Sequence, residues 1–250
     1  MTDVFLPERV PSADDLFRGL MTHLQRFRRE KNVEICGVDI WDLMFGLDVP
    51  RSAIVVGKRS QTKPNGLLGD LAKEFDYHDL TGKPTDPAED ARGCTREHYR
   101  VDQCWWSHYG RSRSLDVAIE HENRPGSYPD ELAKLIFVGA ALRVVVGYPM
   151  KGRNKEIKGV DRALGLAHAL KRSARCPSAS SGTLALILGP RAMTMKQLSA
   201  TSRVWRMWTW DLTSAGPWDW DPDSPDLSGN LDHDPPVEAG PHGHDPPAKA

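Results

Sequence analysis

The chain has 250 residues, of which 39% are hydrophobic and 27% are charged, and its formal net charge is −1. These proportions are those of an ordinary globular protein, and no apolar run approaches the roughly 18–20 residues that a membrane-spanning helix needs. Four scattered cysteines form no Cys-x-x-Cys pair, which argues against a zinc site or a disulfide framework. The first residues lack the basic and apolar segments of a signal peptide, so we expect a cytoplasmic protein.

Charge is unevenly distributed along this sequence. Seven Asp and one Glu against Lys249 alone give residues 217–250 a net charge of −7, so the rest of the chain carries about +6. The same segment contains eight prolines and few aliphatic residues. Such a composition buries too little apolar surface to fold, and we therefore expect residues 214–250 to form a disordered acidic tail. The basic balance of the remainder is compatible with a polyanionic partner.

Residues 1–93 are expected to form a helical region packed on the core. Ser12, followed three residues later by Asp15, resembles a capping box at the start of a helix. Apolar residues then recur at helical spacing, namely Leu16, Leu20, Leu24 and Phe27. Shorter elements are expected farther along: helices at 41–47 and 67–75, a buried segment at 53–57 and a loop at 84–93.

The stretch 115–123 alternates strictly between two kinds of residue. Leu115, Val117 and Ile119 would lie on one face of a strand, and the residues between them, including Asp116, Glu120 and Glu122, on the other. The strand therefore ends with two carboxylates that project side by side. Such a pair repels itself unless a proton or a cation lies between its members.

The segments around this strand predict an α/β core. A strand at 99–106 would pair with it as a hairpin and bring Asp102 near Glu120 and Glu122. The remaining elements expected in chain order are a helix at 128–138, a strand at 142–148, a basic loop at 151–158, a helix at 160–172, a buried strand at 183–189 and an edge strand at 203–210. Strands that alternate with helices favour a mixed β-sheet flanked by helices, here over residues 94–213.

A divalent metal site is the first of three interpretations of Asp102, Glu120 and Glu122. Mg²⁺ prefers hard oxygen ligands and keeps several waters, so two or three carboxylates at adjacent strand ends suffice. A metal-bound water would attack a phosphodiester, while the same ion neutralises charge on the phosphate. Lys134 lies on the following helix, three residues after Glu131, and is a nearby cation for the transition state.

Two other interpretations compete with a metal site. Glycoside hydrolysis also uses two carboxylates, but alternate Cα atoms of a strand are only about 6–7 Å apart, which leaves little room for a sugar. Alternatively, the acids are structural and pair with Arg124, Arg143 or Lys134 at a solvated rim of the sheet. Spacing alone does not separate this structural interpretation from the metal site.

The order of the elements resembles the core of the PD-(D/E)XK nuclease superfamily, which includes many type II restriction endonucleases. The resemblance rests on Asp102, on Glu120-x-Glu122 eighteen residues later, and on the helix and strand that follow. It covers roughly residues 97–190. The superfamily core is a mixed sheet flanked by helices, with an acid on one strand and an acid-x-lysine on the next. Glu122 stands at the usual lysine position, as in some restriction enzymes, and Lys134 stands where other branches carry a migrated lysine.

The resemblance implies Asp102 and Glu120 as ligands of Mg²⁺. It assigns Glu122 as water activator or additional ligand and Lys134 as electrostatic stabiliser. Asp116 is an alternative first acid, although a separation of some 13 Å from Glu120 along the strand is too long for both to bind one ion directly. An acid from the N-terminal region would complete the site, and the candidates are Glu74, Glu89 and Glu97.

The implied activity is Mg²⁺-dependent endonucleolytic hydrolysis of DNA, with DNA as the partner and a homodimer as a possible assembly. Basic residues at 151–158 are expected to contact the DNA backbone. The alternative is a catalytically inactive member that serves as a nucleic-acid-binding or assembly module, because Glu122 replaces the usual lysine; an RNA-directed nuclease is a further alternative. We expect His121 to belong to the core. The Trp205, Trp208 and Trp210 side chains are expected to pack rather than to stack on bases.

Overall fold

The computed structural model describes residues 4–5, 9–31, 67–77, 101–109, 112–122, 124, 126–149, 153–173, 176–189 and 204–230. The elements expected at 41–47, 53–57 and 84–93 lie outside these residues, as do Glu89, Glu97 and the last twenty residues of the tail. Within the described ranges, no helix is both long and apolar enough to cross a membrane.

Among the described residues, seven strands form one sheet in chain order, and this sheet lies at the centre. The strands are β1 (Val4–Phe5), β2 (Gln103–Tyr109), β3 (Ser112–His121), β4 (Leu142–Gly147), β5 (Thr183–Leu188), β6 (Val204–Asp211) and β7 (Leu227–Asn230). The neighbours β3, β4 and β5 are parallel, and all other pairs are antiparallel. The mixed α/β class is therefore confirmed, and the more specific nuclease-like fold stays a prediction.

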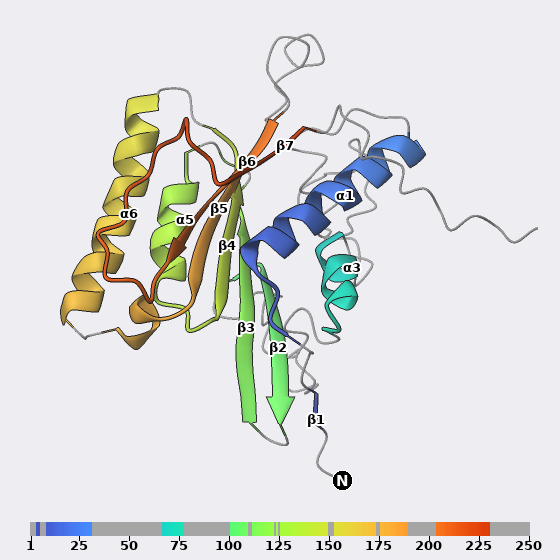
Figure 1. Ribbon diagram of the computed structural model, residues 1–250, viewed down its shortest axis with the longest axis horizontal. Coiled ribbons are helices and arrows are strands. Elements are labelled where there is room, and N and C mark those ends of the chain that lie inside the picture. Colours follow the sequence, from blue (N-terminus) through green and yellow to red (C-terminus); the bar gives the residue numbers. More distant parts are fainter. Residues whose placement is uncertain are drawn as a thin grey trace, which may run out of the picture.

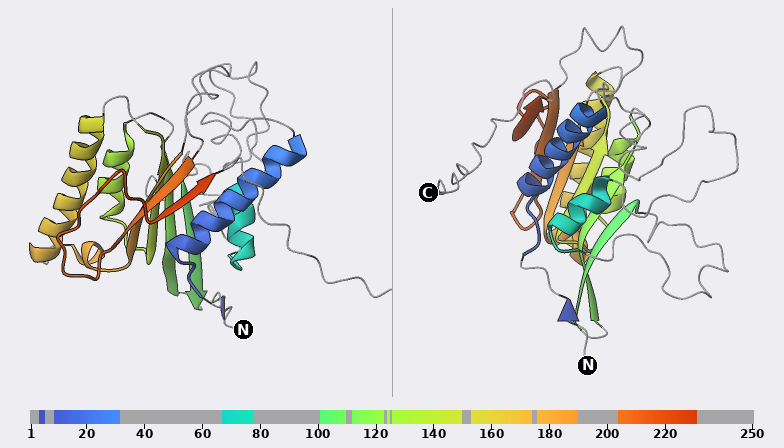
Figure 2. Two further views of the ribbon diagram at one scale, coloured as in Figure 1. Left: turned by 45° about the horizontal axis from the view of Figure 1, so that its top comes forward. Right: turned by 90° about the vertical axis from the view of Figure 1, so that its right-hand side faces the viewer.

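Helices cover both faces of this sheet (Figure 1). One face carries α5 (Tyr128–Leu135) and α6 (Arg153–Ser173), which connect the parallel strands, and the other carries α1 (Ala13–Lys31) and α3 (Leu67–Glu74). Figure 2 shows α1 and α3 together in front of the sheet when the molecule is viewed from their side. Each face has its own buried apolar cluster, so the core consists of two layers, one on each side of the sheet.

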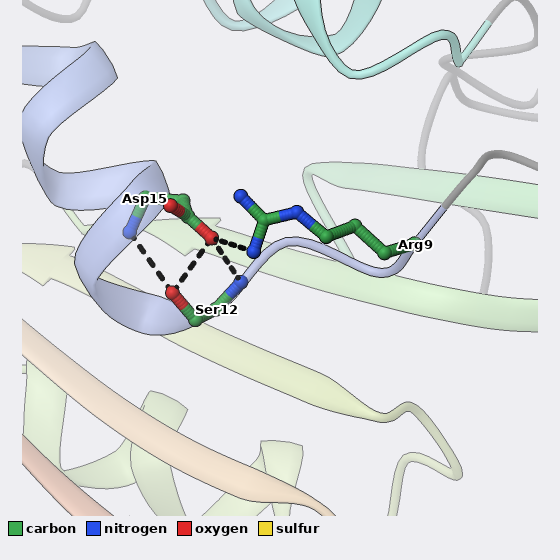
Figure 3. A network of polar contacts seen from close by, with 3 residues as sticks. All are labelled: Arg9, Ser12 and Asp15. Carbon is green, nitrogen blue, oxygen red and sulfur yellow. Dashed lines mark hydrogen bonds and ion pairs between the residues drawn. The ribbon is translucent and has the colours of Figure 1, made fainter.

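The capping box expected at the first helix is present (Figure 3). The Ser12 hydroxyl oxygen accepts a hydrogen bond from the Asp15 backbone nitrogen at 3.1 Å, and Asp15 Oδ2 accepts one from the Ser12 backbone nitrogen at 3.0 Å. Arg9 adds an ion pair with Asp15 at 2.9 Å. The apolar residues Leu16, Leu20 and Leu24 of α1 face the sheet and are fully buried.

A β-bulge at Asp116 breaks the strict alternation that the sequence predicts for β3. Trp105 pairs with Val117, whereas Trp106 pairs with Leu115, so the bulged strand has one extra residue, Asp116, at this point. As a consequence Val117 packs beneath α1 and α3, whereas Leu115 packs with the cluster around α5 and α6. The prediction that Leu115 and Val117 share a face is wrong, and so is the prediction that Asp116 lies on the same face as Glu120.

The Asp116 carboxylate is buried and accepts two hydroxyl hydrogen bonds. Tyr77, just after α3, donates to Oδ2 at 2.9 Å, and Ser107 on β2 donates to Oδ1 at 3.1 Å. Burial, followed by the interaction with Asp116, raises the pKa of the Tyr77 phenol well above its ordinary value, so the hydroxyl stays protonated as a donor. This network ties the α3 segment to the sheet at the bulge.

We expect Tyr77→Phe to reduce the free energy of unfolding by about 1–3 kcal/mol, because Asp116 then keeps a buried carboxylate oxygen without its donor. Urea denaturation of the two proteins measures this difference. Arg18→Met, on the exposed side of α1, is the matched surface control and should change stability by less than about 0.5 kcal/mol. Equal stability of Tyr77→Phe and wild type would contradict the role given to this hydrogen bond.

Three further expectations need correction. The basic segment 153–158 is the first part of α6 rather than a loop, because the helix begins at Arg153 instead of Val160. The strand at 203–210 is not an edge strand, since β7 pairs with β6 on its outer side. Residues 214–230 are ordered rather than a disordered tail: they include β7, and Trp220 packs edge-to-face on Trp208 with ring centroids 5.6 Å apart.

Candidate functional site

The β2–β3 hairpin brings the predicted acids together. Gln103 pairs with Ile119, which places Asp102, directly before β2, beside Glu120 near the end of β3. The His121 backbone nitrogen donates a hydrogen bond to Asp102 Oδ2 at 2.8 Å and fixes that carboxylate at the strand end. The hairpin and the proximity of these two acids were both expected from the sequence.

Helix α5 supplies a cation to the same place. Lys134, in the last turn of α5, lies with its Nζ 2.5 Å from Glu120 Oε1 and also contacts Glu131 Oε2. The side chain of Glu120 is 5% exposed and that of Lys134 is 33% exposed. Asp102, Glu120, Glu131 and Lys134 thus form one cluster, with Lys134 on its solvent side and Glu120 on its buried side.

Burial and negative charge dominate the electrostatics of Glu120. Burial, then the nearby Asp102 carboxylate, raises the pKa of Glu120 to about 9, against the lowering effect of Lys134. The same two acids act on Cys104: burial first, then the charges of Glu120 and Asp102, raises the pKa of its thiol to about 12. Glu120 thus lies in a place that favours either a proton or a cation on its oxygens.

The remaining carboxylates predicted for the site lie elsewhere or make other contacts. Glu122 follows the last residue of β3, and its Oε1 accepts a hydrogen bond from the Arg124 backbone nitrogen at 2.6 Å. Asp116 binds Tyr77 on the other face of the sheet. Glu74 pairs with the His23 Nε2 atom at 3.0 Å, also on that other face. The role of Glu122 in the site stays a prediction.

His121 belongs to the core, as expected. Its ring lies on the α1 and α3 side of the sheet, where Nε2 and the Tyr148 hydroxyl share a hydrogen bond of 2.7 Å. Burial lowers the pKa of His121 to about 3, so the imidazole is neutral at physiological pH. Trp205, Trp208 and Trp210 are buried as well, which confirms packing rather than base stacking as their role.

Arg143 was one candidate partner for the acids at a solvated rim, and the structure assigns it another role. Its guanidinium is fully buried and donates to three backbone carbonyls, those of Val138 at 2.5 Å, Ser181 at 2.8 Å and Ser178 at 2.7 Å. These carbonyls belong to the segments that lead into β4 and β5. Arg143 therefore links the segment before β4 to the segment before β5, and its guanidinium bonds to these backbone carbonyls rather than to the acids.

Two carboxylates and their neighbours are compatible with a hard divalent ion. Among the residues that the structure describes, no group of three or more His, Cys, Asp or Glu side chains is arranged to hold a metal. Mg²⁺ does not need such a group, because it binds through one or two carboxylates and keeps several waters. The carboxylate oxygens of Asp102 and Glu120 are of the type that meets that smaller requirement.

Glu131 is the member of the cluster that the sequence indicated least clearly. Its spacing from Lys134 placed both on one side of the helix, but only the structure shows that Lys134 bridges Glu131 and Glu120.

Comparisons of the chain with protein-family models, with curated proteins and with solved structures found no match. The inference about function therefore rests on the cluster itself.

Proposed function

We propose that this protein is a Mg²⁺-dependent endonuclease that hydrolyses DNA phosphodiester bonds. The observation that carries the proposal is the convergence of Asp102, Glu120 and Lys134 at the β2–β3 hairpin and α5. Two acids from neighbouring strands and a lysine from the following helix match the arrangement that the PD-(D/E)XK resemblance implies. The resemblance supports the proposal through these three positions.

Each residue has a separate task in the proposed reaction. Asp102 and Glu120 would hold Mg²⁺, which supplies a nucleophilic water and neutralises charge on the phosphate when it is bound. The hydrogen bond from the His121 backbone keeps Asp102 in place for this task. Lys134 offers its ammonium to the negative charge that develops on the phosphate oxygens. Its partial exposure leaves it accessible to a substrate.

Charge supports a polyanionic substrate. The sequence before residue 217 carries about +6, and the α6 residues Lys155 and Lys158 are exposed. Cations on a helix surface contact phosphates without reading sequence. DNA is the substrate that the resemblance implies, and RNA is the competitor that an experiment must separate from it.

Cleavage by the purified wild-type protein tests this proposal. Supercoiled plasmid, linear duplex and single-stranded RNA are incubated with Mg²⁺, with Mn²⁺ or with EDTA, and the products are resolved on gels. We expect nicked or linear DNA in both metals and intact DNA in EDTA. Preferential cleavage of the RNA would show that RNA rather than DNA is the substrate. Intact nucleic acid under all conditions would contradict the nuclease function.

A catalytically inactive binding or assembly module is the second candidate. The Glu122 carboxylate, at the usual lysine position, accepts a hydrogen bond from the Arg124 backbone nitrogen. The Lys134 ammonium contacts the carboxyl groups of Glu120 and Glu131. Both observations are also compatible with a charged cluster that does no chemistry. DNA binding without metal-dependent cleavage in the same assay would identify this module.

The pKa of Glu120 predicts a pH-dependent metal affinity. Because burial raises this pKa to about 9, the metal-free carboxyl keeps its proton at neutral pH and must release it when a cation binds. Affinity for Mg²⁺ should therefore rise about tenfold per pH unit between pH 6 and 8 and level off above pH 9. Calorimetric titration measures this slope. A flat profile, or the same slope in Glu120→Gln, would contradict the assignment.

A further inference from the structure

The exposed side of α1 carries arginines that no acidic side chain neutralises. Arg18 and Arg26 are both exposed, and among the residues that the structure describes neither forms an ion pair. They lie on the side of α1 that faces away from its buried leucines. At the rise of an α-helix, their separation in sequence places them about 12 Å apart along the helix axis.

The helix dipole explains only the cations at the very end of α1. A favourable interaction between a cation and the dipole is limited to the last turn of a helix. In α1 this turn contains Arg28, Arg29 and Lys31, whereas Arg26 precedes it and Arg18 lies in the second turn of the helix. The exposed charges of Arg18 and Arg26 are therefore not needed to stabilise the helix, and they are available to an anion.

Charge is also separated along α1. The acids Asp14 and Asp15 lie in its first turn. From Arg18 to Lys31 the helix carries five Lys or Arg residues against Glu30 alone, so this part has a net charge of +4. A helix with this distribution presents a positive surface over most of its length, which favours a polyanionic partner.

This positive part of α1 lies at the end of the sheet that holds the candidate site. α1 runs from the middle of the sheet toward the end at which β3, β4 and β5 finish (Figure 1, Figure 2). Asp102 and Glu120 lie at the same end of the sheet. α6 begins there too, on the opposite face, with Lys155 and Lys158 exposed. Helices on both faces thus present cations around the candidate site.

We propose that the exposed side of α1 is a DNA-binding surface on which Arg18 and Arg26 contact phosphates of the duplex. The inference takes its DNA partner from the proposed function and names a surface that holds this substrate. Successive charges of one DNA strand are about 3.4 Å apart along the helix axis, so arginines about 12 Å apart contact different phosphates. The planar guanidinium matches the oxygens of a phosphate, and such contacts hold DNA without reading its sequence.

DNA binding measured in EDTA tests this surface separately from cleavage. Fluorescence anisotropy of a labelled duplex, titrated with the full-length protein at several KCl concentrations, gives the affinity and its salt dependence. Each phosphate contact contributes about 0.9 to the slope of log affinity against log salt concentration. Arg18→Gln and Arg26→Gln should each reduce the magnitude of this slope by about 0.9 and weaken binding by roughly 5- to 10-fold at about 0.1 M KCl. The losses should add in the double variant, because the two residues are far apart.

Arg172→Gln is the matched control for both variants. Arg172 is exposed and lies in the last turn of α6, at the opposite end of the sheet (Figure 1). Screening by salt should keep its effect on the affinity below about twofold. Arg26→Lys keeps the charge and should keep the salt slope. Since these side chains are exposed, each single variant should melt within about 2 °C of the wild type.

The binding measurement separates failure of the inference from failure of the nuclease function. A wild type that cuts no DNA but binds it, with the expected losses in Arg18→Gln and Arg26→Gln, would refute the nuclease and leave the α1 surface standing. Unchanged salt slopes in these two variants, or an equal change in Arg172→Gln, would overturn the role of α1. A wild type that does not bind the duplex, or that binds an RNA duplex of the same sequence more tightly, would overturn DNA as the partner of this surface.

Discussion

Glu120→Gln is expected to lower metal-dependent DNA cleavage by about 10³-fold, because the amide offers Mg²⁺ a neutral oxygen in place of a carboxylate. The substitution preserves the shape of a side chain that is almost fully buried. Since burial already favours the neutral form of this residue, the variant should unfold at the same temperature as the wild type or higher. Single-turnover cleavage and thermal unfolding measure the two effects.

The matched control for Glu120→Gln is Asp130→Asn. Asp130 is a carboxylate on α5 whose ion pair with Arg162, at 3.3 Å, is solvent-exposed. Such a pair contributes at most about 1 kcal/mol to stability. We expect cleavage by Asp130→Asn within about twofold of the wild type. Wild-type cleavage by Glu120→Gln would show that Glu120 has a structural role at the end of β3 and is not a metal ligand.

Arg143→Met is expected to lower the free energy of unfolding by at least about 3 kcal/mol. The change removes the donors of three buried carbonyls, and hydrogen bonds from a charged group are among the stronger ones. Burial lowers the pKa of Arg143 only to about 10, so the guanidinium is charged at neutral pH. The melting temperature should fall by roughly 6–12 °C.

Arg162→Met is the control for Arg143→Met, because it removes an exposed guanidinium from α6. We expect its unfolding free energy to change by less than about 0.5 kcal/mol. Urea denaturation of both variants gives the comparison. A loss below about 1 kcal/mol in Arg143→Met would mean that the loops around Ser178 and Ser181 satisfy their carbonyls in another way.

Much of the arrangement of the candidate site could be predicted because its signals are local. The apolar alternation around Ile119 indicates a strand, and the polar segment before it indicates a hairpin, which brings Asp102 beside Glu120. The helical spacing of Glu131 and Lys134 places both side chains on one side of α5. These patterns depend on the period of a single element, and the bulge at Asp116 lies before Ile119 and Glu120 and does not change their alternation.

The errors arise where a tertiary contact decides the outcome. The sequence of β3 gives no signal of the bulge at Asp116, because the bulge follows from the pairing of Trp105 and Trp106 with this strand. Residues 214–230 have a composition typical of disorder, yet the few apolar side chains they contain find partners. Trp220 packs on Trp208, and β7 completes the edge of the sheet at β6.

The start of α6 was also placed too late, for a related reason. Three of the six residues 153–158 are basic and the segment carries no continuous apolar stripe, so the sequence favoured a loop. In the structure Glu156 is buried in the first turn of α6, where it accepts a hydrogen bond from the Tyr128 hydroxyl of α5. A buried polar pair between two helices holds this turn in place.

Crystals grown with Mn²⁺ and measured near its absorption edge test the central claim most directly. We predict an anomalous peak between Asp102 and Glu120, with one oxygen of each carboxylate about 2.1 Å from the ion, a distance close to that of Mg²⁺ ligands. The absence of a peak at this place would contradict the metal site and the nuclease function built on it.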